Sequence, residues 1–276
     1  MTIVQIFILA FVQGITEFLP ISSSGHLILV PILTGWTDQG LMMDVAVHMG
    51  TLAAVLLYFR HDTKGLFLAA IGMFGIAPAR RAIEGTIYGR LFWALVIGTI
   101  PLVIIGGLIV ATGANNFMRG AEVIAATSII FGVILYIADK KGITEKTLDR
   151  MAIKPALIIG LAQTLALIPG TSRAGITMTA ARYLGFTRTE AARWSMLMSI
   201  PAIIASGAAT TVKALQTATA DMWFDAAIGV GLSCLAALGA IHFLMRWLKH
   251  ADMTIFAVYR VLLGLGLFVL VITGHI

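Results

Sequence analysis

Six apolar stretches, each close to 20 residues long, constrain the fold of this chain more than any other feature. They occupy the ranges 41–59, 91–111, 121–138, 190–211, 224–245 and 254–273. A helix needs about 20 apolar residues to cross the hydrocarbon layer of a membrane. Only 12% of the residues are charged and 59% are hydrophobic, whereas soluble domains carry about 25% charged residues. We therefore expect an all-α polytopic membrane protein with six full spans, about ten helical segments in all, and membrane lipids around it.

Two polar segments interrupt this apolar pattern. The first is Gln13-Gly-Ile-Thr-Glu-Phe-Leu-Pro-Ile-Ser-Ser-Ser-Gly-His26, and the second is Pro169-Gly-Thr-Ser-Arg-Ala-Gly175. The helical pieces on either side of each break are too short to span about 30 Å of hydrocarbon. Such broken backbone is tolerated at membrane depth only where protein or a wet cavity surrounds it. Each break therefore predicts a re-entrant helix hairpin, and we expect the two breaks to meet and form one site.

The two halves of the chain can be overlaid. An offset of 149 places Pro20 on Pro169, and each half then reads as helix, proline, small hydroxyl-bearing turn, helix and long spans. Interrupted segments at matching positions indicate internal repeats with a site at their interface. We expect a single domain, 1–276, made of pseudo-repeats 1–138 and 155–276 joined by a polar cytoplasmic loop, 139–154.

The distribution of positive charge predicts the topology. With the loop 139–154 in the cytoplasm, 16 of the 19 Lys and Arg residues fall on that side, two fall outside and Arg173 belongs to the second break. The two outside are Arg119 and Lys213. Cytoplasmic loops carry such an excess, so we interpret the net charge of +6 as topology and expect no nucleic acid partner. The count puts both termini outside and inverts one repeat relative to the other. The residues counted as cytoplasmic are Arg60, Lys64, Arg80, Arg81, Arg90, Lys140, Lys141, Lys146, Arg150, Lys154, Arg182, Arg188, Arg193, Arg246, Lys249 and Arg260.

Facing hairpin tips would form a binding site for phosphate. The second helix of each hairpin would point its N-terminus at the meeting point, and helix N-termini bind anions. Arg173 adds a planar cation suited to phosphate oxygens. The hydroxyl side chains of the two breaks add donors, and we take them as substrate-binding candidates: Ser22, Ser24, Thr171 and Ser172. Serines in such turns are more often helix caps. Glu17 and Arg173 are therefore the stronger indication of a functional site, because ionisable residues inside a membrane are functional by default.

Three further residues favour phosphoryl transfer over phosphate binding alone: Glu17, Ser23 and His26. A carboxylate, a hydroxyl and an imidazole beside a phosphate site can supply a nucleophile and its base. Ser23 could attack with His26 or Glu17 as base, or Glu17 could instead hold a divalent cation, Mg²⁺ or Ca²⁺, on the phosphates. Gln13 lies four residues before Glu17 on the same helix face. His48, four residues after Asp44, could line the cavity or form an interfacial pair.

These motifs resemble those of the bacterial undecaprenyl-diphosphate phosphatase family, which is also linked to bacitracin resistance. The first break matches the family signature, and Gln13 fits its (Glu/Gln)-x-x-x-Glu pattern. The second break resembles Pro-Gly-x-Ser-Arg-Ser-Gly, and Leu197-Met-Ser-Ile-Pro-Ala-Ile203 resembles a later segment. The chain departs from the family at Ala174, where Ser is usual, and at His48, where Gln is more usual.

The resemblance implies a function, a location and partners. It implies hydrolysis of undecaprenyl diphosphate to undecaprenyl phosphate and inorganic phosphate, which recycles the lipid carrier for cell-wall polysaccharide synthesis. It also implies a divalent cation, a homodimer, and a site in the bacterial inner membrane that opens to the outer, periplasmic face. Glu17, Ser23, His26 and Arg173 would be the catalytic residues. The alternative function is a polyprenyl-phosphate transporter or flippase, because inverted repeats with broken helices are also a transporter architecture.

Overall fold

The chain folds into helices throughout the part that the structure describes. In this computed structural model that part comprises residues 1–112, 120–142, 145–217 and 220–274, without the side chains of residues 209–221. No β-strand occurs among these residues, and the expected all-α polytopic architecture is confirmed. The helices, in chain order, are α1 (Ile3–Thr16), α2 (Ser23–Thr34), α3 (Gly40–Tyr58), α4 (Arg60–Met73), α5 (Ala77–Ile83), α6 (Tyr88–Thr112), α7 (Ala121–Lys141), η2 (Leu148–Arg150), α8 (Ile153–Gln163), η3 (Thr164–Leu167), α9 (Arg173–Tyr183), α10 (Arg188–Thr217), α11 (Ala220–Trp247) and α12 (Thr254–Ile272), where η marks a 3-10 helix.

Five helices in the described ranges are long and apolar enough to cross a membrane. They are α3, α6, α7, α11 and α12, and they coincide with five of the six expected spans. The sixth expected span, 190–211, lies in α10, whose 30 residues reach about 45 Å at 1.5 Å per residue. One helix was not expected: α5 forms in a basic stretch, with a proline in its first turn and Arg80 and Arg81 in its last turn, where they complement the helix dipole.

Both expected hairpins are present as pairs of short helices. Helices α1 and α2 contain 14 and 12 residues, and α8 and α9 contain 11 each, so none exceeds about 21 Å. Helix α2 continues through Pro31 and is capped by Gly35, whose φ of 68° is left-handed. Pro31 removes one backbone hydrogen bond from this helix, because proline has no N–H.

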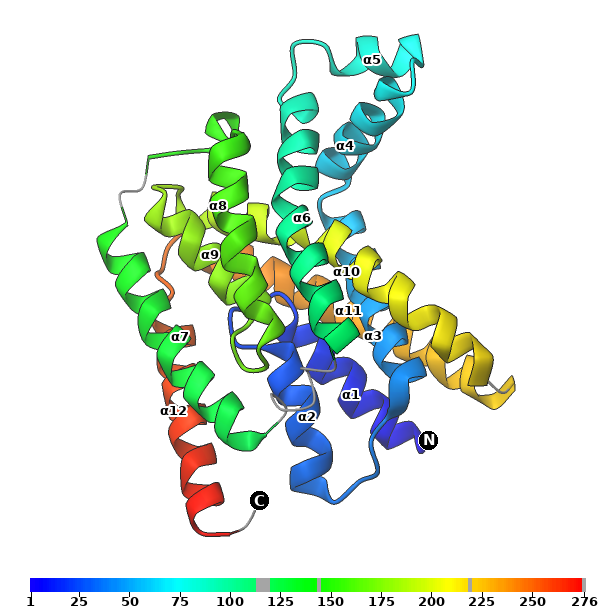
Figure 1. The fold of residues 1–276 in the computed structure, drawn as a ribbon, viewed down its shortest axis with the longest axis vertical. Coiled ribbons are helices and arrows are strands. Elements are labelled where there is room, and N and C mark those ends of the chain that lie inside the picture. The colour runs from blue at the N-terminus through cyan, green and yellow to red at the C-terminus, as the bar shows by residue number, and fades with distance from the viewer. Residues whose placement is uncertain (113–119, 143–144, 218–219, 275–276) are drawn as a thin grey trace.

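The packing of the helices is nearly symmetric between the two halves. Helix α1 packs against α11, and α8, its counterpart, packs against α6 (Figure 1). Each hairpin packs internally, α1 on α2 and α8 on α9, while α3 contacts α10 and α7 contacts α12. Interchanging the two halves turns each contact within the first set of pairs into its counterpart, and it leaves the pairs α3–α10 and α7–α12 unchanged, as internal repeats require. The boundaries 1–138 and 155–276 stay a prediction.

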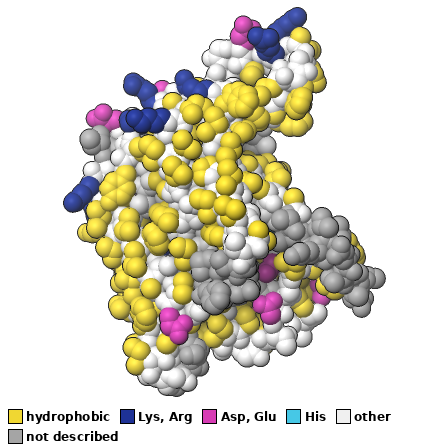
Figure 2. Space-filling view, in the orientation of Figure 1, with side chains coloured by type: hydrophobic (Ala, Val, Ile, Leu, Met, Phe, Trp, Pro, Cys, Tyr) yellow, Lys and Arg dark blue, Asp and Glu magenta, His cyan; other side chains and the backbone are white. Residues whose placement is uncertain are grey.

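Basic side chains gather at one end of the molecule. Figure 2 shows Lys and Arg over the tip formed by α4 and α5 and over the end where α8 begins, with a mostly hydrophobic surface below. Met1 and the end of α12 lie away from this basic end (Figure 1). Two residues counted as cytoplasmic are in fact fully buried, Arg182 and Arg260. Arg119 and the side chain of Lys213 lie outside the described residues.

The polar segment 139–154 is anchored to the helices at its start. Asp139 is buried in α7 and accepts hydrogen bonds from Arg182 Nε at 3.1 Å and Arg188 Nε at 2.8 Å. Its second oxygen accepts from the backbone N–H of Met253 at 3.0 Å. A buried carboxylate with two cations and a backbone donor is well compensated. Asp139 thus joins α7 to α9 and to the starts of α10 and α12.

Candidate active site

The two breaks share one backbone geometry. Ser22 and Ser172 are the non-glycine residues with positive φ in the described chain, at 75° and 68°. Each caps the following helix: Ser22 Oγ accepts from Gly25 N at 3.4 Å, and Ser172 Oγ accepts from Gly175 N at 3.0 Å. The matching offset at the caps is therefore 150, and the offset of 149 is wrong there, because the second turn holds one more residue between its proline and its serine. Ser23 corresponds to Arg173, the first residue of α9.

The structure brings the two turns together. The closest link is the ion pair between Glu17 Oε1 and Arg173 Nη2, which lie 2.8 Å apart. The backbones also approach closely, because a Cβ added to Gly25 would lie 3.7 Å from the Cα of Gly170. Thr127 on α7 donates to the carbonyl of Pro169 at 2.7 Å and braces the second turn. The expected meeting of the two breaks is therefore observed.

Glu17 lies at the centre of this contact and is 7% exposed. Its Oε2 accepts from Ser23 Oγ at 2.6 Å and from Gln13 Nε2 at 2.9 Å, while Oε1 accepts from Arg173. A carboxylate removed from water needs such partners, since an unpaired buried charge costs several kcal/mol. The acid therefore connects a hydroxyl of the first break to the cation of the second.

Arg173 is held on three sides. Beyond Glu17, its Nη1 donates to the backbone carbonyl of Ser195 on α10 at 2.9 Å, and its guanidinium lies 6.0 Å from the ring centroid of Phe18. The Ser195 hydroxyl is itself held by Thr177 Oγ1 at 2.7 Å. These contacts fix the plane of the guanidinium, which is the requirement for two-point binding of phosphate oxygens.

His48 lines the same site. Its Nε2 lies 4.0 Å from Glu17 Oε2, and its Nδ1 lies 2.6 Å from the Asp44 carbonyl oxygen. A nitrogen that close to a carbonyl must carry the proton, so Nδ1 donates and Nε2 faces the carboxylate. Of the two alternatives open from the sequence, the structure favours the first, because His48 lies beside Glu17.

His26 points away from Ser23 and Glu17, contrary to the expectation that all three converge. Its Nδ1 lies 2.7 Å from the Ser22 carbonyl oxygen, and its Nε2 lies 2.6 Å from the hydroxyl of Tyr259 on α12. The two rings are stacked with centroids 5.8 Å apart. With Nδ1 donating to the carbonyl, a neutral Nε2 accepts from Tyr259. His26 therefore has both nitrogens engaged outside the Glu17 cluster.

The remaining hydroxyl groups of the two turns differ in how they are engaged. Ser22 and Ser172 act as helix caps. Ser24 is exposed, with its Oγ 3.5 Å from Ser22 Oγ. Among the described residues, the buried atoms Thr171 Oγ1 and Gln13 Oε1, the latter beside Glu17, have no hydrogen-bond partner. A buried polar atom without a partner is costly, so both atoms are candidates for contact with a ligand.

Sequence reasoning did not assign Ser195, Tyr259 or Arg260 to the site. Tyr259 and Arg260 are neighbours on α12; Tyr259 contacts His26, and Arg260 donates to carbonyl groups of both turns. The charge count had assigned Arg260 to the cytoplasmic side. A signal was present in the sequence, because Arg260 lies seven residues inside an apolar span, where an ionisable residue is functional by default.

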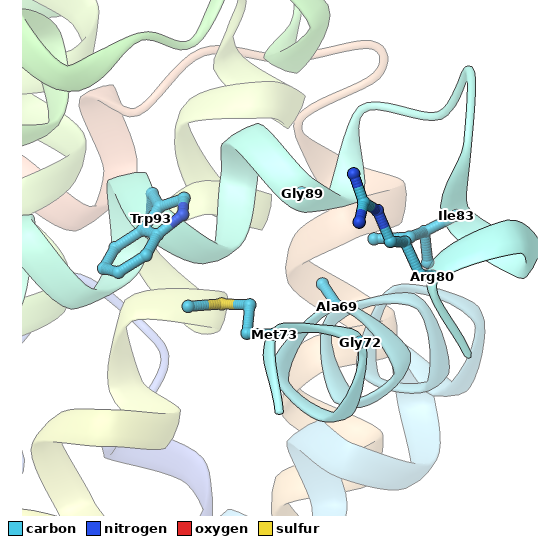
Figure 3. Close-up of a pocket in the computed structure, with 7 residues that line it drawn as sticks. All are labelled: Ala69, Gly72, Met73, Arg80, Ile83, Gly89 and Trp93. Atoms are coloured by element: carbon cyan, nitrogen blue, oxygen red, sulfur yellow. The ribbon is translucent and has the colours of Figure 1, made fainter. Parts of the chain in front are cut away.

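Two surface pockets lie away from the turns. One, of about 330 Å³, is lined by residues of α4, α5 and α6, with Arg80 and Trp93 on opposite sides (Figure 3). The other, of about 500 Å³, lies at the end of α11 and includes Arg246 and Trp247. Neither contains a residue of the two breaks.

The comparisons with known proteins agree on one family. A family model described as "Bacitracin resistance protein BacA" matches residues 6–266. An "Undecaprenyl-diphosphatase" of Jannaschia sp. is 49% identical over 273 residues, which are 98% of this chain and 99% of that protein. Proteins with the same name from Teredinibacter turnerae and Campylobacter curvus are 46% and 48% identical, covering 98% and 97% of this chain and 100% and 98% of their own lengths.

Proposed function

Because the chain belongs to the bacitracin resistance protein BacA family, we propose that it hydrolyses undecaprenyl diphosphate to undecaprenyl phosphate and inorganic phosphate. The observation that carries this proposal is the shared carboxylate: Glu17 accepts from Ser23 in one turn and pairs with Arg173 in the other. A hydroxyl, its base and a phosphate-binding cation are thereby in contact. The reaction returns the lipid carrier to cell-wall polysaccharide synthesis.

The terminal phosphate binds between the N-termini of α2 and α9. Both helices direct free N–H groups and positive dipole ends toward the meeting point. Arg173 supplies the fixed charge, and the unpartnered Thr171 hydroxyl supplies a donor. The terminal phosphate displaces the Glu17 carboxylate from part of the Arg173 fork, so that Arg173 pairs with phosphate while Glu17 keeps its hydrogen bond to Ser23.

Ser23 is the nucleophile and Glu17 is its base. The Ser23 hydroxyl already donates to Glu17 at 2.6 Å, which is the reach that proton transfer requires. The oxygen of Ser23 attacks the terminal phosphorus, its proton passes to Glu17, and the phosphorus–oxygen bond to the lipid monophosphate breaks. Glu17 releases this proton to solvent and then accepts a proton from the water that attacks the phosphoserine; the phosphorus–oxygen bond to Ser23 breaks, Glu17 returns the proton to the Ser23 oxygen, and inorganic phosphate leaves. His26 is not the base for Ser23 in this arrangement, since Ser22 and Tyr259 occupy its nitrogens.

A divalent cation, Mg²⁺ or Ca²⁺, belongs to the proposal. Both ions prefer oxygen ligands, and the unpartnered Gln13 Oε1 lies on the residue that contacts Glu17. These two residues would hold the ion together with phosphate oxygens. Bound there, the ion would offset phosphate charge in the reaction.

Location and assembly follow the family expectation as proposals. We place the protein in the bacterial inner membrane, with the basic end in the cytoplasm by the positive-inside rule and the site open to the periplasmic face. A homodimer is the expected assembly. Light scattering of the detergent-solubilised protein tests the dimer, and reagent access to cysteines placed at Met1 and at Arg81 tests the orientation.

Phosphate release from undecaprenyl diphosphate in detergent tests the function directly. The wild-type protein should release phosphate without any membrane to separate two sides, whereas a flippase would release none. Glu17→Gln should lower kcat about 1,000-fold, because general base catalysis contributes 10²–10⁴-fold. Glu84→Gln, which changes an exposed acid on the connection after α5, should retain wild-type activity. Near-normal turnover by Glu17→Gln would rule out the proposed base.

A further inference from the structure

Arg260 is a buried cation without an acidic partner. Its side chain is fully buried in α12, and no Asp or Glu oxygen of the described residues lies within ion-pair distance of it. The other fully buried arginine, Arg182, pairs with Asp139 at 3.1 Å. An unpaired buried charge is costly, so the position of Arg260 needs a reason other than ion pairing.

The Arg260 guanidinium donates to carbonyl oxygens of both turns. Its Nη2 lies 2.8 Å from the carbonyl oxygen of Thr171 and 2.9 Å from that of Gly170, both in the second turn. Its Nη1 lies 3.4 Å from the carbonyl oxygen of Pro20 in the first turn. A further contact of 3.4 Å reaches the Thr127 carbonyl on α7. One side chain thus joins the two breaks, and the planar fork of arginine is what allows two separate sets of acceptors.

Two glycines leave room for this side chain. A Cβ on Gly175 would lie 2.6 Å from Arg260 Nη1, and a Cβ on Gly132 would lie 3.0 Å from Arg260 Cβ. The first glycine opens the path of the guanidinium between the turns, and the second lets α7 approach α12. The positions of the Arg260 guanidinium and of its Cβ therefore both require a glycine as neighbour.

The carbonyl groups that Arg260 binds precede the two capping serines. Ser22 and Ser172 adopt positive φ, a conformation that persists in non-glycine residues only when its surroundings hold it. Arg260 therefore contacts the backbone within two residues of each cap, at Pro20 in the first turn and at Gly170 and Thr171 in the second.

We propose that Arg260 is a positioning residue that clamps the two turns together and so aligns Ser23 and Glu17 with Arg173. The part of this proposal that concerns catalysis rests on the proposed phosphatase function. Arg260 itself does not touch the phosphate, because its Nη atoms are directed at backbone oxygens. It acts through the geometry of the two caps.

Hydrogen–deuterium exchange on Arg260→Lys, in the full-length protein in detergent, tests the clamp without relying on activity. A lysine amine cannot reach both turns, so amides in 20–26 and in 169–176 should exchange faster together. Arg182→Lys is the matched control, since it also replaces a fully buried arginine, and its faster exchange should centre on 139–142 and 185–188, around the groups that Arg182 contacts. Unchanged exchange in both turns, or faster exchange in only one of them, would overturn the clamp.

Kinetics provide the second measurement. Arg260→Lys should lower kcat about 100-fold, since a misplacement of about 1 Å can cost that much, while KM changes less than about threefold because the lipid tail still binds. Arg182→Lys should lower the melting temperature with kcat nearly unchanged for the folded protein. A folded Arg260→Lys protein with wild-type kcat would overturn the positioning role.

Gly175→Ala provides an independent variant that keeps Arg260. Its Cβ would displace the guanidinium, so faster exchange in both turns and about a tenfold loss of kcat are expected. Gly231→Ala on α11, where a Cβ meets nothing within 4 Å, is the control. If the wild-type protein releases no phosphate, the proposed function fails, and the exchange measurements still decide the clamp.

Discussion

The turn before α2 and the turn before α9 start their helices in the same way but present different side chains at the equivalent position. Both have a serine cap with positive φ and a glycine three residues later. At the first helical residue the first turn carries Ser23 and the second carries Arg173. In the proposed function, the first turn supplies the reacting groups and the second supplies the charge that holds the phosphate.

This difference shows how one backbone motif can serve two chemical roles. A helix N-terminus attracts phosphate whatever its first side chain is, so both turns can contribute N–H groups. In the proposed function, the residue at the first helical position gives each turn its role: Ser23 attacks the phosphorus and Arg173 binds the phosphate. Glu17 joins the two roles, because its two oxygens contact one residue from each turn.

Ser23→Ala should lower kcat the most among the changes that compare the first turn with the second. Loss of the attacking oxygen should lower kcat about 1,000-fold or more, as expected for removal of a nucleophile. Ser24→Ala, the change of the adjacent exposed hydroxyl, should lower it less than about tenfold, because Ser23 donates to Glu17 whereas the Ser24 hydroxyl contacts Ser22. Rapid-quench trapping with radiolabelled substrate should label the wild-type protein on serine. Turnover without any labelled protein would contradict the role of Ser23.

Arg173→Lys should have the next largest effect. Lysine keeps the charge but loses the planar fork that contacts both Glu17 and the Ser195 carbonyl. We expect kcat/KM to fall about 100-fold, since an Arg-to-Lys change at a two-point site is not conservative. Steady-state kinetics at several salt concentrations provide the measurement. An equal loss in Arg188→Lys, whose partner is Asp139, would show that the loss is not specific to the site.

Tyr259→Phe should have a moderate effect on the first turn alone. Removing the hydroxyl leaves His26 Nε2 without its partner at 2.6 Å, so the imidazole is less well positioned. We expect kcat to fall about tenfold, less than the roughly 100-fold that a misplacement of about 1 Å can cost, because His26 holds the first turn through the Ser22 carbonyl. Tyr58→Phe is the matched control, because Tyr58 packs edge-on against His242 away from the site. Equal activity in the two variants would show that the contact between Tyr259 and His26 does not contribute to the reaction.

Ser22→Ala and Ser172→Ala should have the smallest effects, and the effects should be similar. Each change removes one capping hydrogen bond from the same backbone geometry, which costs about 1 kcal/mol of stability. Thermal unfolding in detergent measures both. A loss confined to one variant would show that the two turns are less alike in energy than in shape.

Part of this architecture could be predicted from the sequence. The spans follow from hydrophobic length, and the contact between Glu17 and Arg173 followed from charged residues at two breaks in an apolar chain. The sequence could not show which way side chains face on uniformly apolar helices. In 254–273 almost every residue is apolar, so no periodicity revealed that Tyr259 and Arg260 face the turns.

Other differences have local causes. The offset of 149 aligned the two prolines, but the second turn is one residue longer, so the caps match at 150. His26 was expected beside Ser23 because the two are three residues apart on one helix. Its ring instead reaches the Ser22 carbonyl and α12, and a tertiary contact of this kind leaves no trace in residue spacing.

A double-mutant cycle across the two turns tests the central claim, that both breaks form one reaction site. Glu17→Gln and Arg173→Lys should each lower kcat/KM, by about 1,000-fold and about 100-fold. Groups that act as a unit are strongly non-additive, so we predict that the double variant loses less than about tenfold beyond Glu17→Gln alone. A loss near the product of the two, about 100,000-fold, would show that the turns act independently and would contradict the account.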